Sequence, residues 1–204
     1  MTKKGQLTTS DYFPIYEFIR LLECLNNDKL YKWELYCRIS FYTALRASDV
    51  LSLTWHDLLN RKELIKIERK TTKGRRIKLD IGTAEEITSF YQLLGNPDIN
   101  QPFFCNPKTG KAYGLEYINK KLKRFRVKYR LEIQAFSTHT FRKTFARNYF
   151  ETENCSTEAI LTLKELLNHA DISTTSRYIG LKQDRIDQAY YSAYHALNKP
   201  STMS

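Results

Sequence analysis

Strand-like alternation is confined to a small part of this chain, and this limits the folds that it can adopt. Residues 64–68 and 76–80 alternate apolar and polar side chains, and the segment 71–74 between them has the composition of a hairpin turn. Residues 101–105 are a further candidate, as a short edge strand. We therefore expect one small antiparallel sheet in a chain that is otherwise helical.

Apolar side chains recur at helical spacing over most of the remaining sequence. Leu35, Ile39 and Tyr42 show this pattern in one segment, and Ser10 and Asp11 are candidate caps for the first helix. The expected helices cover residues 12–22, 31–43, 48–53, 83–94, 115–128, 139–152, 157–167, 172–178 and 183–197. The predicted fold class is α+β, mainly α-helical, with a small antiparallel β-sheet.

The length of 204 residues allows one domain, or a compact domain with appendages. No stretch approaches the roughly 18 apolar residues of a membrane span, and the N-terminus lacks the apolar segment of a secretory signal. The four cysteines are scattered and form no Cys-x-x-Cys pair, so we expect neither a zinc site nor a disulfide framework. These features predict a cytoplasmic protein.

Cations outnumber acids in this chain, which carries a formal net charge of +11. A basic surface attracts polyanions over long distances. Proteins without a nucleic-acid partner can also be basic, but here the cations cluster, most clearly over residues 120–130, which contain no acid. A second basic region, residues 61–78, is diluted by Glu63 and Glu68. We expect a nucleic acid as the partner, contacted by Lys73, Arg75, Lys120, Lys121, Lys123 and Arg124.

A second set of side chains has the chemistry needed to cleave a phosphodiester. The set is Arg46, Lys70, His139, Arg142, His169 and Tyr178. The transition state of phosphoryl transfer gathers negative charge on its equatorial oxygens, and fixed cations lower its energy. Arginine suits this task because its planar fork donates paired hydrogen bonds and stays protonated. A tyrosine hydroxyl can then attack the phosphorus.

Taken one at a time, these residues have ordinary explanations. Either arginine can be a surface residue, His139 can cap a helix or sit in a core, and most of the 14 tyrosines must be packing residues. Spacing adds one constraint, because His139 and Arg142 share a face of a helix when they are three residues apart. The sequence around each residue is more informative.

Three segments carry this local information. Residues 43–53 read Thr-Ala-Leu-Arg-Ala-Ser-Asp-Val-Leu-Ser-Leu, residues 139–142 read His-Thr-Phe-Arg, and residues 167–169 read Leu-Asn-His. In order and content they resemble the boxes of the tyrosine recombinase (phage integrase) family, in its catalytic domain. The resemblance covers roughly residues 30–182. It implies the helical fold with a small sheet that these enzymes share with type IB topoisomerases.

The sequence departs from the family pattern at a few positions. Ala44 stands where the family commonly has glycine, and Asp49 stands where it has glutamate. Asn168 also replaces a glycine, a change that is tolerable if the backbone there is left-handed, since asparagine visits that region. Lys143 follows Arg142 where a histidine is frequent, and we assign Lys143 no chemistry.

The resemblance implies that Tyr178 attacks the scissile phosphate, which gives a 3′-phosphotyrosyl link and a free 5′ hydroxyl. The hydroxyl of a partner strand then reverses the step, and a Holliday junction forms on the way to products. Arg46 and Arg142 would bind the non-bridging oxygens. Because the tyrosyl ester stores the energy of the broken bond, we expect no ATP, no metal and no other cofactor.

Proton transfer is assigned to the remaining members of the set. We expect His139 to accept the proton of the tyrosine and His169 to donate a hydrogen bond to the phosphate. Lys70 is the candidate general acid for the leaving 5′ oxygen, with Lys73 as the rival. Asp49 is expected to orient Arg46 through a salt bridge, or to act as an acid at a helix N-terminus.

The resemblance also predicts domains and partners. Residues 1–182 are expected to form the catalytic domain without an N-terminal clamp domain, because only about 30 residues precede the first box. Residues 183–204 are expected to form a helix and tail, exchanged between protomers or packed on their own domain. The expected assembly is a homotetramer on DNA and a monomer in its absence, with accessory DNA-binding proteins as further partners.

Two other functions are compatible with these features. One is a non-catalytic DNA-binding regulator on the same fold, and the other is a type IB topoisomerase or telomere resolvase with the same tyrosine chemistry. The complete set of six side chains favours the recombinase over the regulator. Integration, excision and inversion all remain open as outcomes, although the chain resembles in size the short recombinases of the fimbrial phase-switch type.

Overall fold

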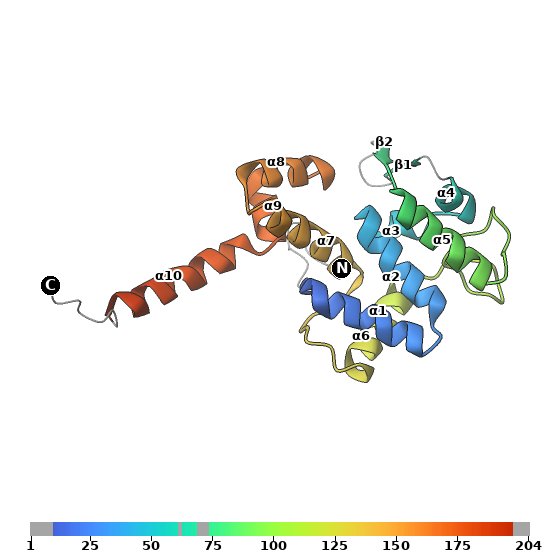
Figure 1. The fold of residues 1–204 in the computed structure, drawn as a ribbon, viewed down its shortest axis with the longest axis horizontal. Coiled ribbons are helices and arrows are strands. Elements are labelled where there is room, and N and C mark those ends of the chain that lie inside the picture. Colours follow the sequence, from blue (N-terminus) through green and yellow to red (C-terminus); the bar gives the residue numbers. More distant parts are fainter. Residues whose placement is uncertain (1–9, 61–62, 69–73, 198–204) are drawn as a thin grey trace. The chain divides into compact units, whose positions relative to one another are not determined.

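The computed structural model describes residues 10–60, 63–68 and 74–197 (Figure 1). Within these residues the chain is mainly helical and has a single two-stranded sheet, which confirms the predicted fold class. The helices are α1 Ile15–Asn27, α2 Tyr31–Thr43, α3 Ala47–Val50, α4 Trp55–Leu59, α5 Ile81–Leu93, α6 Leu115–Lys128, α7 Thr138–Thr152, α8 Thr157–Leu166, α9 Ile172–Tyr178 and α10 Leu181–Leu197.

Three helices, α2, α6 and α9, have the bounds that the apolar periodicity predicts. The first helix does not, because it begins at Ile15 and not at residue 12. Pro14 precedes it in an extended conformation, with ψ of 143°, so the helix cannot start earlier. Ser10 and Asp11 are therefore not its caps: the Ser10 carbonyl accepts from Lys143 Nζ at 2.6 Å, and Asp11 pairs with Ala135.

The two strands of the sheet are β1 (Leu64–Ile67) and β2 (Gly74–Ile77), which pair antiparallel with Lys66 opposite Arg75. The second strand begins two residues before its predicted start and ends at Ile77. Asp80, predicted as its last residue, caps α5 instead, since its side chain accepts from the Thr83 amide. Local alternation continues past Ile77, but the competing cap ends the strand.

Two further segments differ from the sequence prediction. Helix α4 was not predicted, although Thr54 and Asp57 form a capping box at its start. The edge strand expected at residues 101–105 is not formed in this described region, where only the isolated bridges Thr54–Pro102 and Cys105–Ala112 occur. Pro102 has no amide hydrogen and cannot donate to a ladder, which explains the short pairing.

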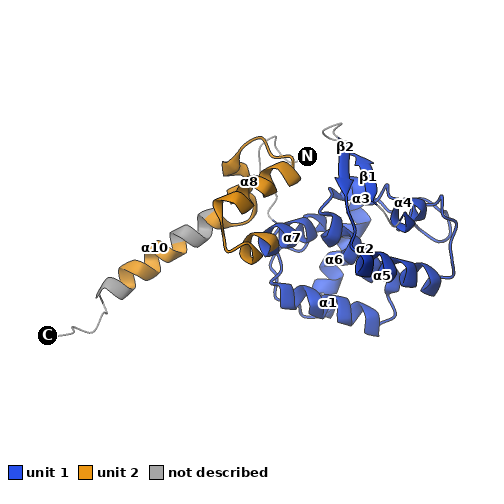
Figure 2. Cartoon of the chain, turned by 45° about the horizontal axis from the view of Figure 1, so that its top comes forward, with its two compact units in different colours: residues 1–148 blue, residues 149–204 orange. Residues whose placement is uncertain are grey.

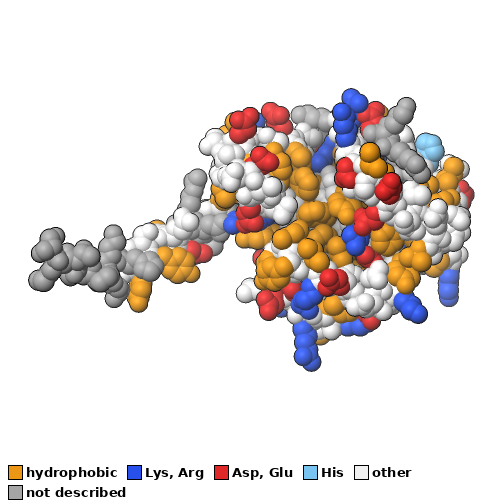
Figure 3. All heavy atoms as spheres, in the orientation of Figure 1, with side chains coloured by type: hydrophobic (Ala, Val, Ile, Leu, Met, Phe, Trp, Pro, Cys, Tyr) orange, Lys and Arg blue, Asp and Glu red, His pale blue; other side chains and the backbone are white. Residues whose placement is uncertain are grey.

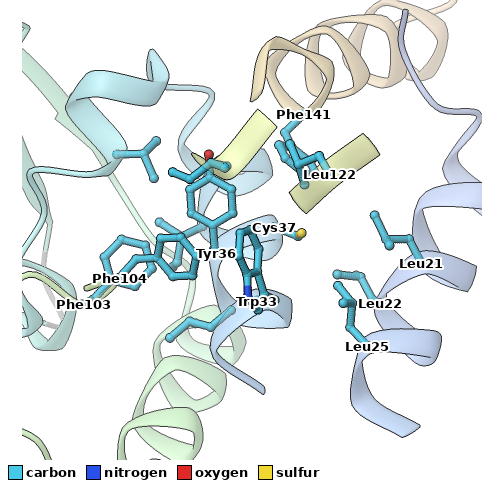
Figure 4. Packing of buried hydrophobic residues seen from close by; sticks show 14 of the residues in the cluster. Leu21, Leu22, Leu25, Trp33, Tyr36, Cys37, Phe103, Phe104, Leu122 and Phe141 are labelled. Atoms are coloured by element: carbon cyan, nitrogen blue, oxygen red, sulfur yellow. The ribbon is translucent and has the colours of Figure 1, made fainter. Parts of the chain in front are cut away.

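The core of the N-terminal part is rich in aromatic side chains (Figure 4). Trp33 and Tyr36 of α2 pack against Phe104, with ring centroids 4.9 and 4.4 Å apart. Phe141 of α7 lies edge-on to Tyr36 at 5.9 Å. Phe141 precedes Arg142, so burial of this ring fixes the start of α7 against α2 and limits where the arginine can lie.

The chain divides into two compact units, residues 1–148 and residues 149–204 (Figure 2). The first unit holds α1 to α6, the sheet and most of α7. The second holds α8, α9 and α10, in which α9 packs against both of the other helices. The division falls within α7.

No helix in the described ranges has both the length and the apolar character needed to cross a bilayer. The same ranges contain no group of three or more His, Cys, Asp or Glu side chains arranged to hold a metal ion.

Candidate active site

A tight turn at the end of α2 places the first arginine of the set. Ala44 follows the helix in a left-handed conformation, with φ of 45° and ψ of 28°, and its amide hydrogen bonds to Phe41. Glycine adopts this left-handed conformation readily because glycine has no Cβ, so glycine also suits this position. The reversal ends α2 and leaves Arg46 extended, directly before α3.

Arg142 reaches the same turn from α7. Its guanidinium Nη1 donates to the Ala44 carbonyl at 2.6 Å, and its side chain is buried. His139 lies one turn earlier on α7 and is half-buried, and its amide donates to Ser137 Oγ at 3.3 Å. The structure therefore brings the two predicted arginines to one turn of the first unit.

Glu68 and Arg75 belong to the same cluster, although the chemistry of phosphodiester cleavage did not single them out. The Glu68 carboxylate is fully buried and binds Arg46 Nη1 through Oε2, while its Oε1 lies 3.3 Å from Arg75 Nη1. Arg75 also donates to the carbonyls of Thr43 at 2.9 Å and Ala44 at 3.4 Å. Burial lowers the pKa of the Arg75 guanidinium.

A sequence signal for Glu68 exists. Leu64 and Glu68 are four residues apart, so they point to the same face of an extended strand, and that face is apolar at Leu64. A carboxylate on a buried face needs a cation close by. The predicted pairing of Asp49 with Arg46 stays a prediction; Asp49 is buried in α3, and the acid that binds Arg46 is Glu68.

The two candidate general acids, Lys70 and Lys73, lie outside the described residues. In this region the structure describes the chain up to Glu68 and again from Gly74, so neither lysine is included in the description of the site. The choice between them stays as the sequence left it.

The second unit brings together the other two members of the set. Tyr178 is the last residue of α9 and is buried, and its ring lies 5.1 Å from the ring of His169, with the planes 71° apart. His169 Nδ1 lies 3.1 Å from Thr175 Oγ1, one turn before the tyrosine. When the threonine hydroxyl donates to Nδ1, the proton of a neutral ring is on Nε2, which can then donate to a ligand.

The backbone before His169 is left-handed. Asn168 has φ of 53°, the conformation in which asparagine can stand in place of glycine. The amide of His169 donates to the Lys164 carbonyl and that of Asn168 to the Glu165 carbonyl, which is the pattern of a Schellman motif. This turn ends α8 and sends the chain back along α9, so the histidine faces the helix that carries the tyrosine.

The predicted DNA contacts occupy different environments. On α6, Lys120, Lys123 and Arg124 are exposed and Lys121 is half-buried. Arg75 differs from a surface contact, because three groups of the chain itself accept from it. On the face drawn in Figure 3, basic and acidic side chains are interspersed, so the net charge is not gathered into one patch there.

Comparison with known proteins identifies the relatives of this chain. The sequence model of the phage integrase family matches residues 14–185. The probable integrase/recombinase YoeC of Bacillus subtilis is 32% identical over 148 residues, which cover 72% of this chain and 77% of that protein. The tyrosine recombinase XerD of Staphylococcus epidermidis is 24% identical over 196 residues, which cover 93% of this chain and 64% of that protein.

The fold is also found among solved structures. The site-specific recombinase XerH, bound to a palindromic difH substrate in a post-cleavage complex, superposes with a TM-score of 0.67 at 20% identity. The match covers 93% of this chain and 55% of the XerH chain. This chain thus spans about half to three quarters of the length of these proteins.

Proposed function

The chain belongs to the phage integrase family, and from this premise we propose that it is a site-specific recombinase that breaks and rejoins double-stranded DNA. The observation that carries the proposal is the convergence of Arg46 and Arg142 on the turn at Ala44. Two guanidinium groups at one turn suit a single phosphate, whose oxygens gain negative charge in the transition state.

The proposed reaction is a transesterification. The Tyr178 hydroxyl oxygen attacks the scissile phosphorus, the bond from phosphorus to the 5′ oxygen breaks, and a 3′-phosphotyrosyl ester forms. A 5′ hydroxyl from another strand then attacks this ester and releases the tyrosine. One ester replaces another in each step, so the reaction needs no ATP, and we propose that it uses no metal or other cofactor.

Proton transfers follow from the same assignment. His139 accepts the proton of Tyr178, and His169 donates a hydrogen bond to the phosphate. The contact of His169 with Thr175 supports the second role, because a neutral ring that accepts at Nδ1 carries its proton on Nε2, the donor that the role requires. Lys70 protonates the leaving 5′ oxygen, and Lys73 is the alternative.

We further propose that residues 1–182 act as the catalytic domain and that four copies assemble on two DNA sites in the cytoplasm. The basic side chains of α6 supply DNA contacts, which their exposure supports. Residues 183–204 pack on a neighbouring protomer or on their own domain. Tyr190, Tyr191 and Tyr194 of α10 are exposed, which supports the first arrangement, because large aromatic side chains gain most from burial at an interface.

The test uses DNA segments selected from a random library by binding to the protein, rebuilt as nicked duplexes that trap the cleaved state. The wild-type protein should form a covalent adduct that survives SDS, and Tyr178→Phe should form none while its DNA affinity is unchanged. Tyr16→Phe is the matched control, because Tyr16 is 62% exposed and the proposal assigns it no role; it should still form the adduct.

Other outcomes separate the alternatives. An adduct that persists in Tyr178→Phe would place the nucleophile elsewhere. Binding without any adduct in the wild type would favour a DNA-binding regulator. Relaxation of supercoiled plasmids that lack a selected site would favour a type IB topoisomerase.

A further inference from the structure

Glu68 combines deep burial with two cationic partners, and the proposed function gives it no role. None of its side-chain surface is exposed, and it lies directly after β1. A carboxylate without hydration is tolerated only where cations or hydrogen-bond donors replace the lost water. Arg46 and Arg75 fill that requirement here, one on each carboxylate oxygen.

Arg75 ties this carboxylate to the turn of the active site. Besides Glu68, its guanidinium donates to the carbonyls of Thr43 and Ala44. These carbonyls belong to the end of α2 and the left-handed turn that precedes Arg46. The hairpin is thereby fastened to the segment that carries the first arginine, and Arg75 is only 13% exposed.

Arg46 uses one edge of its guanidinium for this contact. Nη1 binds Glu68, and the other two guanidinium nitrogens have no hydrogen-bond partner among the described residues. The side chain is 18% exposed, so an incoming anion can reach it. A guanidinium has five donors in a rigid plane, and fixing one edge sets the direction in which the opposite edge points.

We propose that Glu68 is a positioning residue, which holds one edge of the Arg46 guanidinium so that the free edge binds the scissile phosphate. Arg75 balances the second oxygen of Glu68 and anchors the hairpin to the turn. The two guanidinium groups share one carboxylate, so Arg46, Arg75 and Glu68 together carry a net positive charge. This inference rests on the proposed function, since it assigns Arg46 to the phosphate.

The first measurement separates positioning from DNA binding. Glu68→Gln keeps the size of the side chain but removes its charge and leaves one acceptor oxygen for two guanidinium groups, so the orientation of Arg46 is no longer fixed. At saturating protein on the nicked duplex, the single-turnover rate of adduct formation should fall by about 100-fold, the loss that a displacement of about 1 Å can cause. DNA affinity should be unchanged.

Glu63→Gln is the matched control. Glu63 lies in the same hairpin region and pairs with Arg76, away from the turn at Ala44. Its rate of adduct formation should equal that of the wild type. Equal rates for Glu68→Gln and the wild type would overturn the proposal, whereas a wild type without any adduct would overturn the proposed function itself.

A second substrate distinguishes positioning from a general loss of structure. A methylphosphonate at the scissile position removes the negative charge that Arg46 is proposed to bind. The rate of adduct formation on this substrate should therefore depend less on the Arg46 guanidinium. Glu68→Gln should cleave this neutral substrate at close to the wild-type rate, as should Arg46→Ala. A defect in Glu68→Gln that is equally large on both substrates, or that tracks a loss of folded protein in thermal unfolding, would refute positioning through Arg46.

Discussion

The rings of His169 and Tyr178 meet edge to face, with centroids 5.1 Å apart, while the Nδ1 atom of the histidine lies 3.1 Å from Thr175 Oγ1. The threonine and the tyrosine are both on α9, so one short helix positions the nucleophile and orients the histidine beside it. Both contacts lie within the second unit of the chain.

Removal of the Thr175 hydroxyl should slow cleavage without preventing DNA binding. Thr175→Val keeps the shape of a buried side chain but deletes the partner of His169 Nδ1. A hydrogen bond has a net value of about 1 kcal/mol, so we expect adduct formation to slow by roughly five- to tenfold. Thr175→Ser restores the hydroxyl and should recover the rate. An unchanged rate in Thr175→Val would show that the histidine does not depend on this contact.

The rate of cleavage should depend more on the planar, forked geometry of the Arg142 guanidinium than on its charge alone. Arg142→Lys keeps one positive charge but cannot donate to both the Ala44 carbonyl and a phosphate in the same geometry. Loss of one transition-state donor typically costs about 100- to 1,000-fold in rate, which we expect for adduct formation. DNA affinity should stay close to that of the wild type. Arg124→Lys, an exposed change on α6, should cleave normally.

The cap of α9 should affect cleavage as well as stability. Asp171 accepts from the Thr174 amide at 2.7 Å and from Ser173 Oγ at 2.8 Å. Asp171→Ala removes the cap, so α9 should fray, and both the melting temperature and the rate of adduct formation should fall. Asp80→Ala removes the corresponding cap of α5 in the other unit, and should lower the melting temperature alone.

The same cap predicts a dependence on pH. The hydroxyl of Ser173 and the amide of Thr174 hold the pKa of the Asp171 carboxyl below its usual value of about 3.9. The charged cap therefore stabilises the folded state above about pH 4, and this contribution is lost as the pH falls through the lowered pKa. In NMR titrations the Thr174 amide should shift in that acidic range. Asp171→Asn keeps a neutral cap and should abolish the shift.

The left-handed turn at Asn168 should tolerate glycine and reject a β-branched residue. Asn168→Val forces a bulky side chain to φ near 53°, which should cost about 1–2 kcal/mol of unfolding free energy. Asn168→Gly should be neutral or slightly stabilising. Urea unfolding monitored by circular dichroism measures both, and equal stability of the valine and glycine variants would contradict the observed turn.

DNA binding through α6 should show in its dependence on salt. Lys120 and Lys123 are exposed on this helix, and each cation that neutralises a phosphate adds about 1 to the slope of log K against log salt concentration. Changing both to alanine should lower the slope by about 2. The exposed pair Lys108 and Lys111, in a loop, is the control and should leave the slope unchanged.

Local sequence patterns predicted most of the helices because their cause is local. The apolar periodicity of residues 31–43 and 115–128 gave the bounds of α2 and α6. The prediction of helix caps was weaker where a distant segment of the chain binds the same side chains or backbone groups. Ser10 and Asp11 look like caps in sequence, but Lys143 and Ala135 bind them in the folded chain.

The family and the order of the candidate catalytic residues follow from the amino-acid sequence alone, because they depend on residue identity and on near neighbours. Tertiary folding alone brings Glu68 to Arg46. The two residues are 22 positions apart along the chain, and folding of the hairpin onto the end of α2 buries the Glu68 carboxylate between two guanidinium groups. Electrostatic pairing depends on distance through space and on lost hydration, and neither can be read from spacing along the chain.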